Sequence, residues 1–543
     1  MFALVWPGGA GDNCAMSSNL KNFGIVSVLT VASRVLGLAR DILITAVFGT
    51  TAWASAFVMA FTLPNLFRRF LGEGALTAAL VPTLSEELET GSRERAFRLV
   101  NQVSSWVGLA TGVIVVVAMA GLAGVAGSNV LDSWTEVAEK AQRWRQAAGL
   151  AVVLFPYLIF ICLSAALSAA LQTLGKFAAP ALSPVWLNLA IIAFLGGATY
   201  ATGIADDAVR MNWLCAGVLV GGLCQLLGPA LALWREGWRP RVDFTASPAV
   251  RRMLWLMGPT VLGSAVYLIN MAVSRFIGLS LNESAVAVLN LATRLIELPI
   301  GVFAISVTTV VFPLISSFAA RQDWAGMGAA YRKGMRLVLA INVPAAVGLM
   351  VLATPIVRVL FQRGAFSAED TGLTVPVLMV FAAGLPVLAF VNLMLRAFYA
   401  EKDTRTPVRG ALLSFWVNVG LSLLLMGPLS TLGLAIASNV AVVLQAYYLQ
   451  HQLSHHRPEL RFGAILPDVA KIVLATAGMA AVVFSGYRFS FSWGSGWGAD
   501  LIRLAGLIPL GGLTYGALVW GLRLEGREEL LAILRRSRER RKA

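Results

Sequence analysis

Arginines inside apolar stretches are the first residues of this chain that could do chemistry. The segment Ser33–Asp41 reads SRVLGLARD and places Arg34, Arg40 and Asp41 in or beside an apolar run. Charged side chains in hydrocarbon normally face a cavity or an opposite charge. On a helix, Arg34 and Asp41 share one face, whereas Arg40 points about 100° away from Asp41. We therefore expect this segment to line a polar cleft.

A second group of charges follows in the sequence LPNLFRRFLGEG, residues 63–74. Arg68 and Arg69 have two interpretations. They anchor a helix at the cytoplasmic membrane surface, or the helix continues through the apolar residues 75–84 and leaves Arg68 facing the cleft. Glu73 lies one helical turn beyond Arg69 and is placed to pair with it. The sequence leaves both interpretations of Arg68 open.

Arg294 and Glu297 form the third group, at a spacing of three residues within RLIELP. Neighbours at this spacing share a helix face and can pair, so a purely structural ion pair is the competing interpretation. The arginines of the three groups nevertheless outnumber the acids beside them. A cleft with this balance favours an anion, and the planar guanidinium suits phosphate in particular.

Composition indicates which elements position these side chains. Of 543 residues, 58% are hydrophobic and 13% charged, and the mean hydropathy is +0.75. Soluble chains are typically about 45–50% apolar and about 25% charged, so a soluble globular protein is excluded. A helix needs about 20 residues to cross the hydrocarbon core. The predicted fold is an all-α polytopic membrane protein with fourteen spans, at residues 23–48, 52–71, 99–126, 147–173, 178–203, 212–234, 253–281, 284–316, 335–361, 372–400, 408–428, 430–450, 467–487 and 499–522.

Positive charge, which gives the chain a net +15, is concentrated in alternate loops and in the tail. Lys and Arg accumulate on the cytoplasmic side of inner-membrane proteins. An even number of spans then places both termini in the cytoplasm of a bacterial inner membrane. This explains the basic character better than nucleic-acid binding does. The basic loops contain Arg93, Arg95 and Arg98, then Arg235, Arg239, Arg241, Arg251 and Arg252, then Arg321, Arg332, Lys333 and Arg336, and finally Lys402 and Arg405.

The two halves of the chain resemble each other at a spacing of about 230 residues. VPTLS at 81–85 matches FPLIS at 312–316, and WLN at 186–188 matches WVN at 416–418. Six spans separate the copies, so the repeats run parallel, as in transporters with a central cleft. The predicted domains are a leader of doubtful role at 1–18, six-helix bundles at 19–235 and 236–452, two additional helices at 453–523 and a basic cytoplasmic tail at 524–543.

Motifs for other kinds of chemistry are missing from the sequence. It contains no GxxxxGK[ST] phosphate loop, so we expect no nucleotide motor. Its four cysteines are scattered and its three histidines lie in one hydrophilic stretch, a pattern that favours neither a zinc site nor a disulfide framework. We expect no metal, no cofactor and no catalytic residue. An ion gradient or the membrane potential is then the energy source.

Four motifs, SRVLGLARD, LPNLFRRFLGEGA, RLIELPIGVF and FYAEKDTRTP, resemble the bacterial MurJ (MviN) family of lipid II flippases. This family is part of the superfamily of multidrug and oligosaccharidyl-lipid exporters, and the likeness runs from about residue 19 to about residue 520. The resemblance implies transport of the lipid-linked peptidoglycan precursor, lipid II, from the inner to the outer leaflet. It implies two states, inward-open and outward-open, and no ATP hydrolysis.

The resemblance also implies roles for particular residues. Where the family commonly has an aspartate early in the second span, this chain has Ser55, so the role of that position is open. The substrate-binding arginines would be Arg34, Arg40, Arg68 and Arg294, with Asp41, Glu297 and Glu73 as charge partners.

Three other functions compete with this interpretation. A cation-coupled or drug exporter of the same superfamily would need acids in the cleft, where the balance here is basic. A flippase for another polyprenyl-pyrophosphate-linked saccharide, such as O-antigen, shares the pyrophosphate, and only the first and third motifs separate the two. A polyprenyl-phosphate transferase would need clustered acids and a metal in cytoplasmic loops that are short and basic here.

Overall fold

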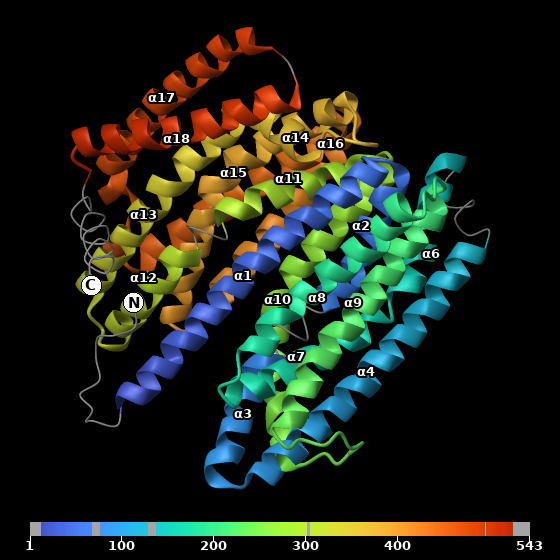
Figure 1. Ribbon diagram of the computed structural model, residues 1–543. Helices are drawn as coiled ribbons and strands as arrows, with labels where there is room; N and C mark the ends of the chain where they lie inside the picture. The colour runs from blue at the N-terminus through green and yellow to red at the C-terminus, as the bar shows by residue number, and fades with distance from the viewer. Residues whose placement is uncertain (1–11, 68–75, 129–136, 301–304, 495, 525–543) are drawn as a thin grey trace. The chain divides into compact units, whose positions relative to one another are not determined.

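Helices make up the regular structure of the chain. This confirms the predicted all-α class, because no strand occurs in the residues that the structure describes (Figure 1). The computed structural model describes residues 12–67, 76–128, 137–300, 305–494 and 496–524.

The chain divides into two compact units. The first comprises the residues up to Phe48 together with Ala52–Leu268, and the second comprises Gly49–Thr51 and the residues from Ile269 onward. In the first unit, α8 packs against both α1 and α9, and α7 packs against α9. Its helices are α1 (Asp12–Phe48), α2 (Ala52–Phe67), α3 (Thr77–Thr90), α4 (Arg93–Gly127), α6 (Ala138–Leu154), α7 (Tyr157–Thr173), α8 (Ala178–Gly196) with the π-helical turn η2 (Gly197–Ala201), and α9 (Asp207–Arg235).

Small residues allow α8 and α9 to approach closely. A Cβ atom at Gly221 would lie 2.9 Å from the Cα of Leu187, and one at Gly217 would lie 3.1 Å from the Cα of Ile191. Membrane helices commonly use small residues four positions apart so that their backbones can touch. Any larger side chain at Gly221 would therefore push the two helices apart.

The second unit is built around α15, which packs against α13, α16 and α11. Its core includes the fully buried side chains of Tyr331, Met335 and Leu393. α10 begins in the first unit and ends in the second. The elements are α10 (Pro248–Leu281), α11 (Ala285–Pro299), α12 (Ile305–Ala320), α13 (Trp324–Val351), α14 (Ala353–Phe361), α15 (Ala368–Ala400), α16 (Arg405–His456), the 3-10 turns η4 (Pro458–Leu460) and η5 (Phe462–Ile465), α17 (Leu466–Phe489), the turn η6 (Ser490–Trp493) and α18 (Trp497–Gly521).

α16 joins two predicted spans into one continuous element of 52 residues. Ser430 within it has φ 50° and ψ −135°, so two helices meet there. The predicted spans 408–428 and 430–450 correspond to its two arms. In the part described, eight helices are long and apolar enough to cross a membrane, and α6 with α7 forms a further candidate bent by 44°. The polytopic fold is confirmed, and the number fourteen stays a prediction.

A carboxylate links three chain segments at one end of the first unit. Glu236, just after α9, lies 2.8 Å from the ammonium nitrogen of Lys176 and 2.9 Å from a guanidinium nitrogen of Arg93. The hydrogen bond from Lys176, followed by that from Arg93, holds the pKa of Glu236 below its usual value. The three residues therefore join the start of α4, the α7–α8 connection and the end of α9.

Candidate functional site

Arg40 is fixed in place by two side chains. Its Nε and Nη2 donate to Asp41 Oδ1 at 3.0 and 2.7 Å, and its Nη1 donates to Asn188 Oδ1 of α8 at 3.0 Å. The Arg40 and Asp41 side chains are only 12% and 16% exposed. Asn188 in turn donates to the carbonyl of Ser33 at 3.1 Å, so one amide ties α8 to α1 at two points.

The pairing of Asp41 differs from the helix-face expectation. Helical periodicity places Arg34 and not Arg40 on the face of Asp41, yet Asp41 accepts two hydrogen bonds from its neighbour Arg40. The reason is the length of the arginine side chain, which curves around the helix toward the position where Asn188 also binds it. Among the described residues, no carboxylate lies within ion-pair distance of Arg34.

Arg34 lies at a concavity of about 380 Å³ within the first unit. α1, the end of α7 and the start of α8 form its walls, and the Arg34 side chain is exposed. The nearby hydroxyl of Thr30 donates to its own helix at Val26, and its hydrogen is thus already used. Arg34 is the charged group of this concavity, whose lining is otherwise Val26, Thr30, Ser33, Gln172, Phe177, Pro180, Ala181 and Pro184.

Arg294 and Glu297 pair on α11, as their spacing predicts. The Arg294 Nη1 lies 3.2 Å from Glu297 Oε2, and the two side chains are 38% and 44% exposed. Pro299, the last residue of α11, follows them within the same helix. An exposed pair of this kind contributes little to stability, typically about 0–1 kcal/mol. The Arg294 side chain is therefore paired with Glu297 while remaining partly exposed.

Two residues of the predicted set, Arg68 and Glu73, lie outside the described residues. Their neighbour α2 contains Pro64 and ends at Phe67. Ser55, whose role the sequence left open, lies on α2 and is fully buried. The side chain at this buried position of α2 is therefore uncharged.

Two asparagines of the repeated WxN motif have matching positions in the two units. Asn418 of α16 donates to Asn270 Oδ1 and Ser274 Oγ of α10, both at 2.8 Å. Asn188 lies 230 residues before Asn418, and Arg40 lies 230 residues before Asn270. Corresponding positions therefore meet in both units, but the hydrogen bond is reversed: Asn188 accepts from the cation Arg40, whereas Asn418 donates to the neutral amide of Asn270. The sequence contained the motif, but nothing in it indicated the contact.

The second unit also contains buried ion pairs that the sequence did not lead us to predict. Arg336 of α13 contacts Asp468 of α17 at 2.6 Å. Arg503 and Asp500 of α18 contact each other at 2.6 Å and are 2% and 1% exposed. Acids within the predicted spans 467–487 and 499–522 were the available signal. The Arg336–Asp468 pair attaches α17 to α13, and Asp500 also lies 3.5 Å from Arg358 of α14, which attaches α18. Removing one member of such a pair would leave a buried charge without its partner.

The fold is that of a known class of membrane proteins. A solved structure described as lipid II flippase MurJ, inward closed conformation, has a TM-score of 0.73 and 24% identity and covers 93% of this chain and 99% of that chain. An inward-facing multidrug resistance MATE family transporter has a TM-score of 0.61 and 16% identity, covering 79% and 98%. The chain has the fold of a polytopic membrane transporter.

Sequence comparison identifies the family within this class. The chain matches the family described as lipid II flippase MurJ over residues 44–497. A probable lipid II flippase MurJ of Haemophilus influenzae is 31% identical over 504 residues, covering 90% of this chain and 97% of that protein. The corresponding Bdellovibrio bacteriovorus protein is 31% identical over 525 residues, covering 95% and 97%. The chain belongs to the lipid II flippase MurJ family, which confirms the resemblance of its motifs.

Proposed function

We propose that this chain is a flippase that moves lipid II from the cytoplasmic to the periplasmic leaflet of the bacterial inner membrane, for peptidoglycan synthesis. Family membership over residues 44–497 supports the substrate class. The observation that carries the mechanism is Arg34, an exposed cation at a concavity with no carboxylate partner among the described residues. A pyrophosphate is an anion that such a guanidinium binds with charge-assisted hydrogen bonds.

The remaining arginines would complete the phosphate site. Arg294 is exposed enough to reach an anion while keeping its bond to Glu297. Arg40 uses three of its five N–H groups in its bonds to Asp41 and Asn188 and can still donate the other two. We include Arg68 with Glu73 in the proposed set on the basis of the family motif. Asp41 and Glu297 would orient their arginines and would not touch the substrate.

The transport cycle would use alternating access. No nucleotide motif occurs in the sequence, so the membrane potential or an ion gradient would supply the energy. The polyprenyl tail of lipid II is too long for a protein to enclose, and it would remain in the bilayer while the pyrophosphate and sugar-peptide head cross through the protein. Discontinuous helices and parallel repeats are common in carriers of this kind.

The proposed topology has both termini in the cytoplasm, following the alternation of basic loops. The proposed bundles are residues 19–235 and 236–452, with two additional helices at 453–523. The matched contacts of Asn188 and Asn418 support the repeat on which this division rests. In this topology Glu236 and the basic residues around it lie on the cytoplasmic side.

Depletion of the protein in its bacterial host tests the proposal. Loss of the chain should reduce the amount of lipid II that an externally added probe reaches on the outer leaflet, while total lipid II rises. Plasmid-borne wild-type protein should restore both quantities. Unchanged lipid II exposure, together with accumulation of another polyprenyl-linked saccharide inside the cell, would favour the alternative substrate. Unchanged exposure of every such lipid would favour a cation-coupled exporter.

A further inference from the structure

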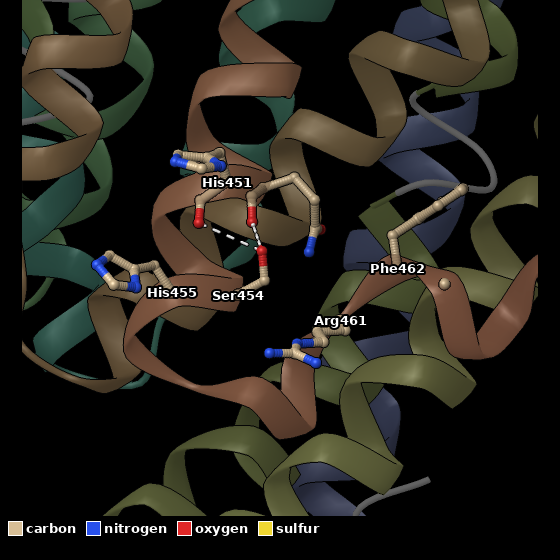
Figure 2. Close-up of a pocket in the computed structure, with 7 residues that line it drawn as sticks. His451, Ser454, His455, Arg461 and Phe462 are labelled. Atoms are coloured by element: carbon tan, nitrogen blue, oxygen red, sulfur yellow. Dashed lines mark hydrogen bonds between the residues drawn. The ribbon is translucent and has the colours of Figure 1, made fainter.

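A pocket of about 530 Å³ lies between the last turns of α16 and the residues that follow η4. Figure 2 shows His451, Ser454 and His455 on α16, with Arg461 on the following segment. α16 and α17 are both candidate membrane spans. The short connection between them therefore lies at a membrane surface. None of the residues proposed for transport lines this pocket.

The wall opposite α16 is held in place by hydrogen bonds. Gln450 accepts a hydrogen bond from the buried Tyr331 hydroxyl at 2.9 Å and donates to the carbonyl of Leu460 at 2.9 Å. Arg332 of α13 donates to the carbonyl of Glu459 at 2.8 Å. The backbone on the N-terminal side of Arg461 is thus attached to two helices. The position of Arg461 beside α16 follows from these bonds and does not depend on a ligand.

The pocket presents hydrogen-bond donors without an acid among the residues that line it. His451 and His455 lie one turn apart on α16, with ring centroids 6.4 Å apart. An imidazole donates at least one N–H whether neutral or charged, and a guanidinium donates five. Among the described residues, no carboxylate lies within ion-pair distance of Arg461.

Two nearby acids, Glu401 and Asp468, already have partners. Glu401 lies 3.4 Å from Arg457, whose guanidinium also stacks over the Trp324 ring at 3.5 Å. Asp468 is paired with Arg336. The charge of Arg461 is therefore not neutralised by these carboxylates.

Two histidines one turn apart can also bind a divalent metal. Two observations oppose a metal here. No group of three His, Cys, Asp or Glu side chains with metal-binding geometry occurs in the described part of the chain. Arg461 also lines the same pocket, and its permanent positive charge repels a cation. The donor set fits an anion with several oxygen acceptors.

We propose that the pocket whose donors are His451, His455 and Arg461 binds a phosphate group, supplied by the headgroup of an anionic phospholipid. The Ser454 hydroxyl in its wall already donates to the Gln450 carbonyl at 2.6 Å. A membrane-surface position favours the phospholipid over free phosphate, since anionic lipids surround it at high local concentration. Phe462 gives the pocket an apolar wall for the adjoining glycerol. The bound lipid would join the end of α16 to the start of α17.

Native mass spectrometry of the purified full-length protein tests this binding without any transport assay. Phosphatidylglycerol and phosphatidylcholine are added separately to wild type, Arg461→Gln and His455→Gln. An exposed ion pair contributes up to about 1 kcal/mol, so each substitution should weaken phosphatidylglycerol binding about three- to fivefold. The double substitution should weaken it about tenfold. Arg252→Gln is the matched control, because Arg252 is an exposed arginine on the first unit, and its binding should equal that of wild type.

Competition with inorganic phosphate distinguishes a phospholipid headgroup from free phosphate as the source of the bound phosphate group. Millimolar phosphate should leave phosphatidylglycerol bound to wild type. Complete displacement by phosphate would overturn the assignment to a lipid headgroup. Equal binding of phosphatidylglycerol by wild type and the double variant would overturn the site altogether. Both pocket substitutions change exposed side chains, and an unchanged unfolding temperature confirms that each variant is folded.

Discussion

Arg34 and Arg294 have different electrostatic surroundings, although both lie on apolar helices. Arg294 keeps Glu297 within 3.2 Å, whereas Arg34 has no carboxylate partner among the described residues. A cation without a partner in a membrane helix is costly and is usually retained for function. We therefore expect Arg34 to contribute more to anion binding than to folding.

The substitution Arg34→Ala should abolish complementation of a depleted host while the protein still accumulates in the membrane. Loss of charge-assisted hydrogen bonds, each about 1.5–3 kcal/mol, should weaken substrate binding about tenfold or more. Arg34→Lys should retain part of the activity, because it keeps the charge but loses the bidentate fork. Arg252→Ala, an exposed arginine elsewhere, is the control. Full growth with both Arg34→Ala and Arg294→Ala would rule out the proposed anion site.

Glu297 allows a sharper test of the pair on α11. If Glu297 only neutralised Arg294, Glu297→Gln should bind the anion at least as well and still transport it. If Glu297 holds Arg294 in one of two orientations beside Pro299, the variant should bind lipid II but fail to complement. We expect the second result, because a proline within a helix removes a backbone hydrogen bond and favours a kink there. Binding and growth are measured in the same strain, and retained transport would remove the switching role.

At the scale of helices, hydropathy was sufficient to predict most elements. The predicted span 23–48 ends where α1 ends, at Phe48, because Gly49 adopts a positive φ of 58°. The partner of Asp41 was not predictable from periodicity, because a long side chain can reach around its own helix. Asn188 and Asn418 were visible as a repeated motif, but their contacts cross 144 or more residues of sequence. Only the packing of distant helices determines such partners.

The two asparagines should differ in their effect on stability. Asn188→Ala removes an acceptor from the charged Arg40 and a donor from the Ser33 carbonyl. Asn418→Ala leaves only neutral groups, on Asn270 and Ser274. Hydrogen bonds to charged groups contribute about 1.5–3 kcal/mol and neutral ones about 0.5–1.5 kcal/mol. Thermal unfolding in detergent should show the larger decrease for Asn188→Ala, and the reverse order would contradict this account.

Glu236 should make stability depend on pH. Lys176 and Arg93 hold its pKa below the usual value, so the link stabilises the folded protein above the ordinary glutamate pKa of about 4.3. That contribution is lost as the pH falls through the lowered pKa. Unfolding temperatures between about pH 6 and pH 3 should fall more steeply for wild type than for Glu236→Gln. Parallel curves would show that the link contributes nothing.

At the scale of the whole protein, the membrane potential acts mainly on charged side chains that have no opposite charge beside them, and most of the proposed site residues are paired. Arg40 with Asp41, and Arg294 with Glu297, are close to neutral as pairs. Arg34 then carries the unbalanced charge among these described residues. One elementary charge moved through 100 mV changes the free energy by about 2.3 kcal/mol. A potential of this size can therefore shift the balance between the two proposed states of the carrier.

An uncoupler should change which cleft positions react with a membrane-impermeant thiol reagent in single-cysteine variants. The shift should be smaller in Arg34→Gln, because that variant has lost the unbalanced charge. The unchanged response of Arg252→Gln would show that the effect is specific to the charge on α1. Labelling that does not change at several positions in wild type would contradict a voltage-dependent cycle.

The close approach of α8 and α9 has a consequence for motion. Gly221 lets the backbone of α9 lie so close to α8 that an added Cβ would be 2.9 Å from the Leu187 Cα, and we expect two helices packed this closely to move together. Asn188 binds α1 to the same pair of helices through Arg40 and Ser33. α1, α8 and α9 would then turn together as one lever, with Arg34 and Arg40 at fixed separation. Both arginines would lose access to one side of the membrane in the same step, so a phosphate bound between them could not be handed from one to the other during the movement.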